Sequence, residues 1–180
     1  MKKALFTAAT LAAFALAQVN WPAPIIGIPN HTARDQVMTA TGKLEQGRPL
    51  EDLSWAASSQ IACFPATQFE KYRGNHVFFA IQLPRQSTMI IKLIPKDSSQ
   101  NLSLYAYSIG TRDATLPPKI ARVTSCESSE KWDRPVAGKT QDHTRSVELR
   151  AIQNPYNVII GVSGPKEAVA GEFTLEVLLK

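Results

Sequence analysis

Several features of common enzyme and membrane classes are missing from this sequence. Its two cysteines, Cys63 and Cys126, are too far apart to form a Cys-x-x-Cys redox or zinc motif. It contains no Gly-x-Ser-x-Gly nucleophile elbow and no His-x-His pair. After residue 17 no apolar run approaches the roughly 20 residues that a membrane-spanning helix needs. The formal net charge of +5 is too small and too evenly spread to favour nucleic acid as a partner.

What remains is the composition of an ordinary globular domain. The chain has 180 residues, of which 44% are hydrophobic and 19% are charged. This length fits one domain with short additional segments. Composition therefore bounds the fold class but names no reaction.

The N-terminus has the pattern of a signal peptide. Two lysines follow Met1, residues 4–16 are apolar, and Ala15-Leu16-Ala17 supplies the small-x-small cleavage pattern. We expect residues 1–17 to be removed, and the mature chain to be exported to the periplasm, the cell envelope or the medium.

Export to an oxidising compartment would favour a disulfide between the two cysteines. Two cysteines in one exported domain usually pair, so we expect a Cys63–Cys126 disulfide. In the chain-entropy model a loop of this length contributes about 4 kcal/mol of stability.

Residues 18–36 predict an irregular N-terminal arm, because prolines interrupt both helix and sheet hydrogen bonding. The arm is also apolar, with Trp21, Ile25 and Ile26 among its side chains. We expect it to pack either on its own domain or on a partner, and we name these three residues as candidate partner contacts.

From about residue 37 the hydrophobic period changes to two, which is typical of strands with one buried and one solvated face. The alternating or apolar segments span residues 76–83, 88–94, 102–109, 119–124, 146–152, 156–162 and 172–179. Only residues 51–60 favour a short helix. Many short strands without intervening helices predict an all-β, antiparallel β-sandwich of about 7–9 strands over residues 37–180.

Four strand motifs occur in an order that resembles a known family. They are residues 72–79 (YRGNHVFF), 101–107 (NLSLYAY), 154–164 (NPYNVIIGVSG) and 171–177 (GEFTLEV). Residues 61–180 thus resemble the bacterial pre-peptidase C-terminal domain family. The resemblance implies a jelly-roll sandwich that serves as a binding or accessory module, and it supplies no catalytic residues.

One departure from that family concerns calcium. Some members have an aspartate where this chain has Ser103, and only Asn101 and Asp97 lie nearby. Calcium prefers six to eight oxygen ligands with several carboxylates. We therefore expect no calcium site.

The sequence contains three histidines, His31, His76 and His143, so a metal-binding function stays an open hypothesis. An envelope sandwich with one disulfide loosely resembles the copper-dependent superoxide dismutases, which need about four imidazoles. This chain has fewer, although Met38 or Met89 could complete a reduced copper site. We expect no cofactor, and we keep a dismutase-like copper protein as the alternative function.

The segment from Glu127 to Arg145 is long, polar and mixed in charge, and it contains the isolated Trp132 next to Arg134. Long loops in compact domains are often functional. Trp132 either anchors a partner or folds back on its own sheet, and we name Trp132 and Arg134 as candidate contacts. Asp142-His143 does not predict a catalytic triad, because adjacent residues of an extended chain point to opposite faces.

The sequence therefore predicts an exported accessory protein that binds a protein or glycan partner, including as a subunit of a larger surface complex. We consider catalysis a weaker hypothesis than binding. A small inhibitor or chaperone of a secreted peptidase is a third class, suggested by the proteins on which the family usually occurs.

Overall fold

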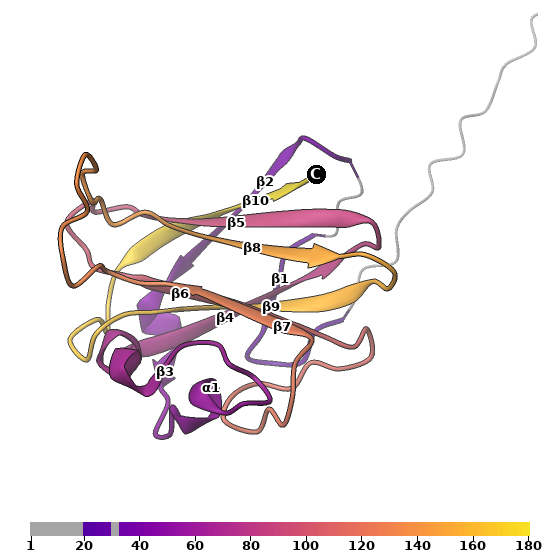
Figure 1. The fold of residues 1–180 in the computed structure, drawn as a ribbon, viewed down its shortest axis with the longest axis horizontal. Coiled ribbons are helices and arrows are strands. Elements are labelled where there is room, and N and C mark those ends of the chain that lie inside the picture. Colours follow the sequence, from indigo (N-terminus) through magenta and orange to yellow (C-terminus); the bar gives the residue numbers. More distant parts are fainter. Residues whose placement is uncertain (1–19, 30–32) are drawn as a thin grey trace, which may run out of the picture.

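The computed structural model describes residues 20–29 and 33–180, which form two stacked β-sheets with a third, irregular layer below them (Figure 1). The predicted signal peptide and His31 lie outside the described residues. The strands are β1 (Ile26–Gly27), β2 (Val37–Lys43), β3 (Arg48–Pro49), β4 (Asn75–Leu83), β5 (Ser87–Pro95), β6 (Ser103–Ile109), β7 (Ser125–Ser129), β8 (Arg145–Ala151), β9 (Tyr156–Ser163) and β10 (Glu172–Leu179).

The strand order is that of a jelly roll. One sheet runs β2-β10-β5-β8 and the other runs β1-β4-β9-β6-β7, with β3 also paired to β4. Without the two short strands β1 and β3, two four-stranded sheets remain, and consecutive long strands alternate between them except at β6–β7. The pairings between these long strands are antiparallel. The predicted antiparallel sandwich is confirmed.

Most strand predictions match the structure to within one or two residues, and residues 172–179 coincide with β10. The prediction for residues 119–124 is wrong, because the strand in this region is β7 at Ser125–Ser129. Ile120 and Val123 pack against the outer hydrophobic cluster instead of alternating in a ladder. The expected helix appears as α1 (Ser54–Ala57), and the 3₁₀ helices η1 (Leu44–Gln46) and η2 (Ala66–Tyr72) were not predicted. No helix in the described ranges is long and apolar enough to cross a membrane.

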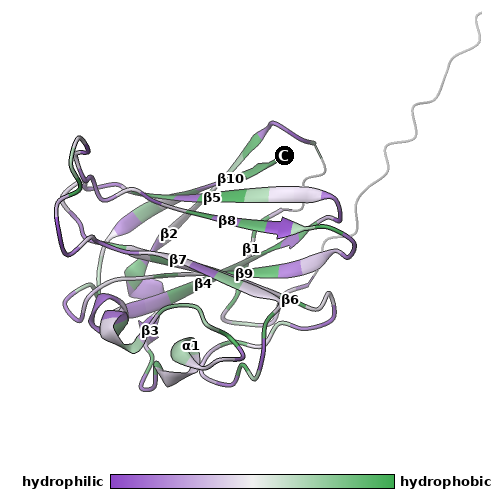
Figure 2. Ribbon diagram, in the orientation of Figure 1, coloured by the Kyte–Doolittle hydropathy of each residue, from purple (hydrophilic) through white to green (hydrophobic). Residues whose placement is uncertain are grey.

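The space between the two sheets holds the main hydrophobic core. Alternate residues of β8 and β10 point into it, and their neighbours are exposed or half-buried, as the period of two predicts. Hydrophobic residues recur along the strands of both sheets (Figure 2). The core includes Phe79, Ile81, Leu93, Leu104, Leu149, Ile160, Phe173 and Val177.

A second hydrophobic cluster covers the outer face of the six-stranded sheet. It contains Trp55 of α1 and Phe64, whose ring stacks on Tyr72 at 3.9 Å between centroids, together with Tyr105 of β6. Every residue of β6 is consequently buried. The expectation that strands such as residues 76–83 and 102–109 have one solvated face is wrong, because the irregular layer between β3 and β4 covers that face.

The N-terminal arm packs on its own domain, which was one of the two expected outcomes. Ile25 is only 8% exposed within the outer cluster, and the Trp21 ring packs against the same cluster. Ile26 belongs to β1, which pairs in parallel with β4 at Phe79. Close approach of the Trp21 ring explains Gly27, where an added Cβ would lie 2.6 Å from that ring. The described part of the arm, residues 20–29 and 33–36, is therefore part of the folded body.

The predicted disulfide is present. Cys63 and Cys126 are bonded across a sequence separation of 63 residues, with their Cα atoms 4.8 Å apart. The bond joins the irregular layer, just after α1, to strand β7. Ser128 of β7 reinforces the junction by donating a hydrogen bond from its hydroxyl to the Cys63 carbonyl at 3.2 Å.

We predict that the natural protein contains this bond and depends on it. Non-reducing peptide mapping should recover the two cysteines in one linked pair, and the Cys63→Ala/Cys126→Ala variant should lose up to about 4 kcal/mol of unfolding free energy in urea. The matched control is wild type with its disulfide intact, measured by the same urea series. Free thiols in the natural product would contradict the prediction.

Candidate partner-binding loop

The most prominent loop of the molecule connects β7 to β8 and projects from one end of the sandwich (Figure 1). The sequence placed its start at Glu127, but residues 127–129 belong to β7, so the loop begins at Glu130. Its far end is Arg145, the first residue of β8.

Side chains of η2 hold the first part of the loop. The Tyr72 hydroxyl donates a hydrogen bond to the Glu130 carboxylate at 2.8 Å. The Lys71 ammonium donates to the Lys131 carbonyl at 3.1 Å and forms an ion pair with Asp133. Trp132 therefore lies between two residues that are fixed to the irregular layer.

Arg145 holds the other end of the loop. Its Nε donates to the Leu102 carbonyl at 3.0 Å, and Nη1 donates to the carbonyls of Asp142 and Thr144, each at 2.9 Å. Nη2 contacts Asn101 Oδ1 and His143 Nδ1, each at 3.3 Å. These five contacts match the five N–H groups of a guanidinium.

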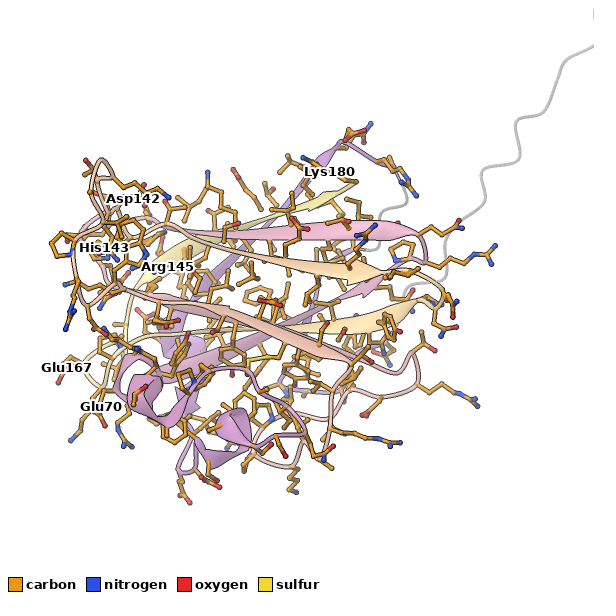
Figure 3. All side chains as sticks on the ribbon, viewed as in Figure 1. Glu70, Asp142, His143, Arg145, Glu167 and Lys180 are labelled. Atoms are coloured by element: carbon orange, nitrogen blue, oxygen red, sulfur yellow. A yellow bond between two sulfur atoms is a disulfide. The ribbon has the colours of Figure 1, made fainter. Side chains whose placement is uncertain are left out.

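The environment of Arg145 is unusual because it is only 3% exposed and yet forms no ion pair with any described residue. Burial lowers the pKa of Arg145 from its ordinary value. Burial, followed by the nearby Arg145 charge, also lowers the pKa of His143. A neutral His143 can accept at Nδ1, so the guanidinium and the imidazole support the same loop geometry. Asp142, His143 and Arg145 gather at this end of the molecule (Figure 3).

Between these anchors the loop displays Trp132, which is 38% exposed. It is the one aromatic residue among the large hydrophobic side chains that are exposed in the described part of the chain; the others are Val37, Val136, Ile152 and Val169. Arg134, two residues further on, is exposed. Trp132 thus keeps accessible surface instead of folding entirely against its own sheet.

A buried hydrogen-bond network links this loop to β4. His76 is 2% exposed, with Nδ1 2.9 Å from the Tyr105 hydroxyl and Nε2 2.7 Å from the Tyr72 carbonyl. A carbonyl can only accept, so Nε2 carries the proton and Nδ1 accepts from Tyr105. Burial lowers the pKa of His76 to about 4, which keeps the ring neutral at pH 7. Tyr72 connects this network to Glu130.

The two described histidines, His76 and His143, have partners within the protein. Both ring nitrogens of His76 are engaged, and His143 contacts Arg145. Among the described residues there is no cluster of three or more His, Cys, Asp or Glu side chains that could hold a metal. His31 lies outside those residues, so the copper alternative stays a prediction.

The residues considered for calcium have partners within the protein. Asp97 accepts hydrogen bonds from the backbone and hydroxyl of Ser99, at 2.9 and 2.7 Å. The Ser103 hydroxyl donates to the Lys71 carbonyl at 2.8 Å. The expected lack of a calcium site also stays a prediction.

The accessible part of the N-terminal arm forms one wall of a groove of about 900 Å³. Its lining includes Pro24 and Ile26 of the arm, residues 115–119, and Val77 and Phe78. Of the predicted contacts in the arm, Ile26 lines this groove and Ile25 lies in the outer cluster. A partner-binding role for Trp21, Ile25 and Ile26 stays a prediction.

The sequence did not predict that Lys71 and Arg145 hold the loop in place. Lys71 lies in η2, for which no sequence signal was found, and it reaches the loop from 60 residues away. Arg145 was noted only as one loop charge. The first position of an alternating strand pattern was the available hint that its side chain points inward.

Comparisons with known proteins return structural matches only. A scan against protein-family models finds no match, and a search of curated proteins also finds none. Among solved structures, the chain is similar to PliG of Aeromonas hydrophila, a periplasmic inhibitor of g-type lysozyme, with 12% identity, a TM-score of 0.41, and coverage of 87% of this chain and 97% of that chain. It is also similar to the pre-peptidase C-terminal domain of a collagenase from Bacillus anthracis, with 10% identity, a TM-score of 0.37, and coverage of 90% and 100%. The second match is to the domain type that the strand motifs resemble; the jelly-roll assignment itself rests on the strand order of this chain.

The buried neutral His76 predicts an acid-sensitive part of the stability. An unfolded histidine has a pKa of about 6.5, whereas that of folded His76 is about 4. The contribution of neutral His76 is therefore complete above pH of about 6.5, and falls by up to about 1.4 kcal/mol per pH unit as the pH drops towards 4, because only the unfolded chain binds the proton.

Urea unfolding at several pH values between 7.5 and 4.5 should show this loss in wild type. The His76→Gln variant, which cannot titrate there but can still donate to the Tyr72 carbonyl, should have a flatter dependence and thus isolate the histidine from the carboxylates. An NMR titration of folded wild type that places the His76 pKa near 6.5 would refute the prediction.

Proposed function

We propose that this protein is an exported binding module that uses the loop from Glu130 to Arg145 to contact a protein partner in the cell envelope or outside the cell. Export is supported by the signal pattern over residues 1–17 and by the disulfide, which is typical of oxidising compartments.

The observation that carries the proposal is the display of Trp132 between two anchored neighbours. Tryptophan is enriched among residues that dominate binding energy. Binding is strengthened when the contact segment is ordered beforehand, because less entropy is then lost on association. Lys71 fixes Lys131 and Asp133 on either side of the ring, which supplies such ordering.

The surroundings of Trp132 favour a protein as the partner. Exposed charges of both signs, including Arg134 and Asp133, flank the ring. An aromatic residue surrounded by polar and charged groups is the usual arrangement of a protein-binding surface. A glycan partner is the other outcome that the experiment below distinguishes.

The loop's acid and histidine support binding better than catalysis. In a catalytic triad a carboxylate accepts a hydrogen bond from Nδ1 of the histidine. Here Nδ1 of His143 contacts the Arg145 guanidinium, while the Asp142 carboxylate accepts from the Thr144 backbone at 2.9 Å. These residues therefore support the shape of the loop.

A photo-cross-linking experiment tests the proposal directly. A photoreactive amino acid is placed at Trp132 in the full chain expressed in its natural host, with the matched position Thr39 on the exposed face of β2 as the control. We expect a discrete cross-linked species from position 132 that is absent from position 39 and that yields peptides of a second protein on digestion. Equal labelling from both positions, or an adduct that contains a glycan and no peptides of a second protein, would contradict a protein partner at this loop.

Affinity measurements then distinguish the contribution of the Trp132 ring from that of other exposed side chains of the loop. For the partner so identified, Trp132→Ala should weaken binding at least about tenfold, or about 1.4 kcal/mol. Val136→Ala removes another exposed apolar side chain of the same loop and should change affinity less than about threefold. Equal losses from the two variants would argue against Trp132 as the anchor.

A further inference from the structure

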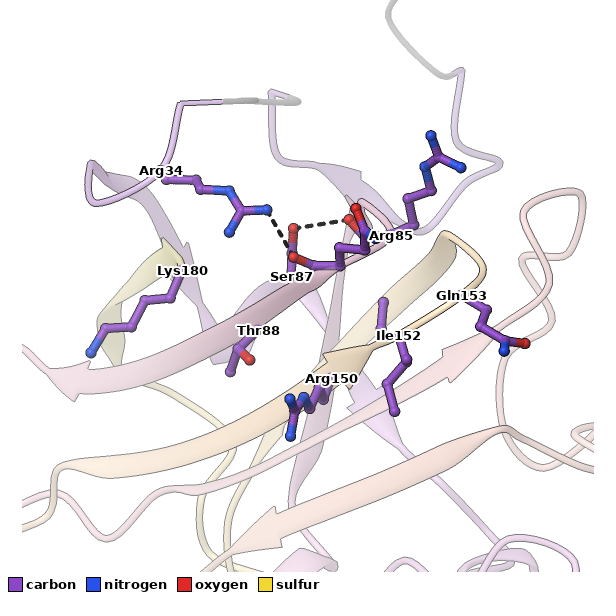
Figure 4. A pocket seen from close by; sticks show the side chains of 10 residues that line it. Arg34, Arg85, Ser87, Thr88, Arg150, Ile152, Gln153 and Lys180 are labelled. Atoms are coloured by element: carbon purple, nitrogen blue, oxygen red, sulfur yellow. Dashed lines mark hydrogen bonds between the residues drawn. The ribbon is translucent and has the colours of Figure 1, made fainter.

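A second surface lies at the end of the sandwich opposite the loop. Strand β8 starts at Arg145 in the loop and runs to Ala151, and its seven residues span roughly 20 Å at about 3.3 Å per residue. At its far end is a cleft of about 650 Å³ whose lining includes Arg34, Arg85, Arg150 and Lys180 (Figure 4).

The cleft carries positive charge without a counter-charge. No acidic residue lines it, and none of the four cations forms an ion pair with a residue in the described ranges. The residues outside those ranges, 1–19 and 30–32, contain no aspartate or glutamate at all. A free carboxylate on Lys180 would offset one charge and leave three guanidinium groups in excess.

The backbone around the cleft is held in place by hydrogen bonds between separate segments. The Arg34 guanidinium donates to the Gln86 carbonyl at 2.8 Å, and the Gln86 N–H donates to the Ile152 carbonyl at 3.2 Å. Thr88 and Lys180 exchange backbone hydrogen bonds of 2.9 and 2.8 Å. Gln86 has a φ of 57°, in the left-handed region that is uncommon for residues other than glycine. The turns that carry the cations are therefore tied together.

The charges come from four different segments: the residues before β2, the β4–β5 turn, strand β8 and the end of β10. Such an arrangement suits a ligand with several separated negative groups better than one with a single carboxylate. Guanidinium groups bind tetrahedral oxoanions such as phosphate and sulfate through pairs of parallel hydrogen bonds. The volume lies in the usual range of small-ligand sites.

The uncharged residues of the lining restrict the chemical class of the ligand further. Gln153 and Thr88 offer amide and hydroxyl groups that suit sugar hydroxyls. Within residues 20–29 and 33–180 no aromatic ring lines the cleft, so this part of the chain supplies no stacking platform for single-stranded nucleic acid. Ile152, 67% exposed, is the one large apolar residue that the described chain contributes to the lining, and it offers little to a lipid chain or an apolar peptide.

We propose that this cleft binds an anionic glycan that carries sulfate or phosphate esters. The site is separate from the Trp132 loop, so the protein has two binding surfaces of different chemistry. Binding in the cleft weakens as salt is added, because the contacts are between partly solvated charges.

Isothermal titration calorimetry of the full mature chain tests this proposal. The probes are a sulfated heparin tetrasaccharide, a phosphorylated mannose oligosaccharide, the desulfated tetrasaccharide, a hexaglutamate peptide and a thymidine tetranucleotide. At 50 mM NaCl we expect measurable binding of the sulfated or the phosphorylated glycan and at least about tenfold weaker binding of the other three. The ester that binds more tightly identifies the source of the oxoanion.

Charge-matched variants locate the site. Arg85→Gln/Arg150→Gln should weaken glycan binding at least about tenfold, whereas Arg112→Gln/Arg122→Gln, which removes two exposed arginines outside the cleft, should change it less than about threefold. Trp132→Ala should leave glycan affinity unchanged, and thermal melting should show that all variants fold. Equal effects of the two arginine pairs, tighter binding of the peptide or the nucleotide, or no glycan binding at all would overturn the proposal.

Discussion

Burial of the six-stranded sheet on both faces is the constraint on which the rest of this structure depends. A sheet face must be covered or solvated, and here the second sheet covers one face while α1, η2 and the N-terminal arm cover the other. The central strands are consequently buried at nearly every position and carry apolar or aromatic residues on both faces, a pattern more familiar from parallel sheets. The irregular layer in turn requires a fixed position, which the disulfide and the Phe64–Tyr72 stack provide.

That layer also explains how the Trp132 loop is held. Lys71 and Tyr72, at the end of η2, contact the loop directly, and Tyr72 also accepts the hydrogen bond from buried His76. The loop is therefore supported by the same residues that fill the outer cluster. A change deep in that cluster should alter the loop before it alters the core between the sheets.

The sequence predicted the strands, whose alternating pattern is local, and did not predict features that arise from contacts between distant segments. The alternation in β8 and β10 is local, and it located both strands to within one residue. In β6 the same alternation suggested a solvated face, but the Tyr105 ring packs against Trp55 and Phe64, which lie 40 to 50 positions earlier in the chain and which no local period reveals. The disulfide was predictable because the compartment and the cysteine count left one pairing. The cationic cleft was not, because its four charges lie in segments that only the jelly-roll topology brings together.

Arg145 has a consequence that reaches beyond the loop it supports. Its guanidinium is bound by carbonyl, amide and imidazole groups and by no carboxylate of the described residues, while Asp142 and Glu130 act on its charge only from a distance. From Glu130 to Arg145 the four basic side chains outnumber the three acidic ones, which gives a formal charge of +1. A fixed cation beneath the proposed binding loop attracts negatively charged molecules during diffusion. Together with the cationic cleft at the opposite end of the sandwich, this charge should accelerate encounter with acidic molecules at low ionic strength.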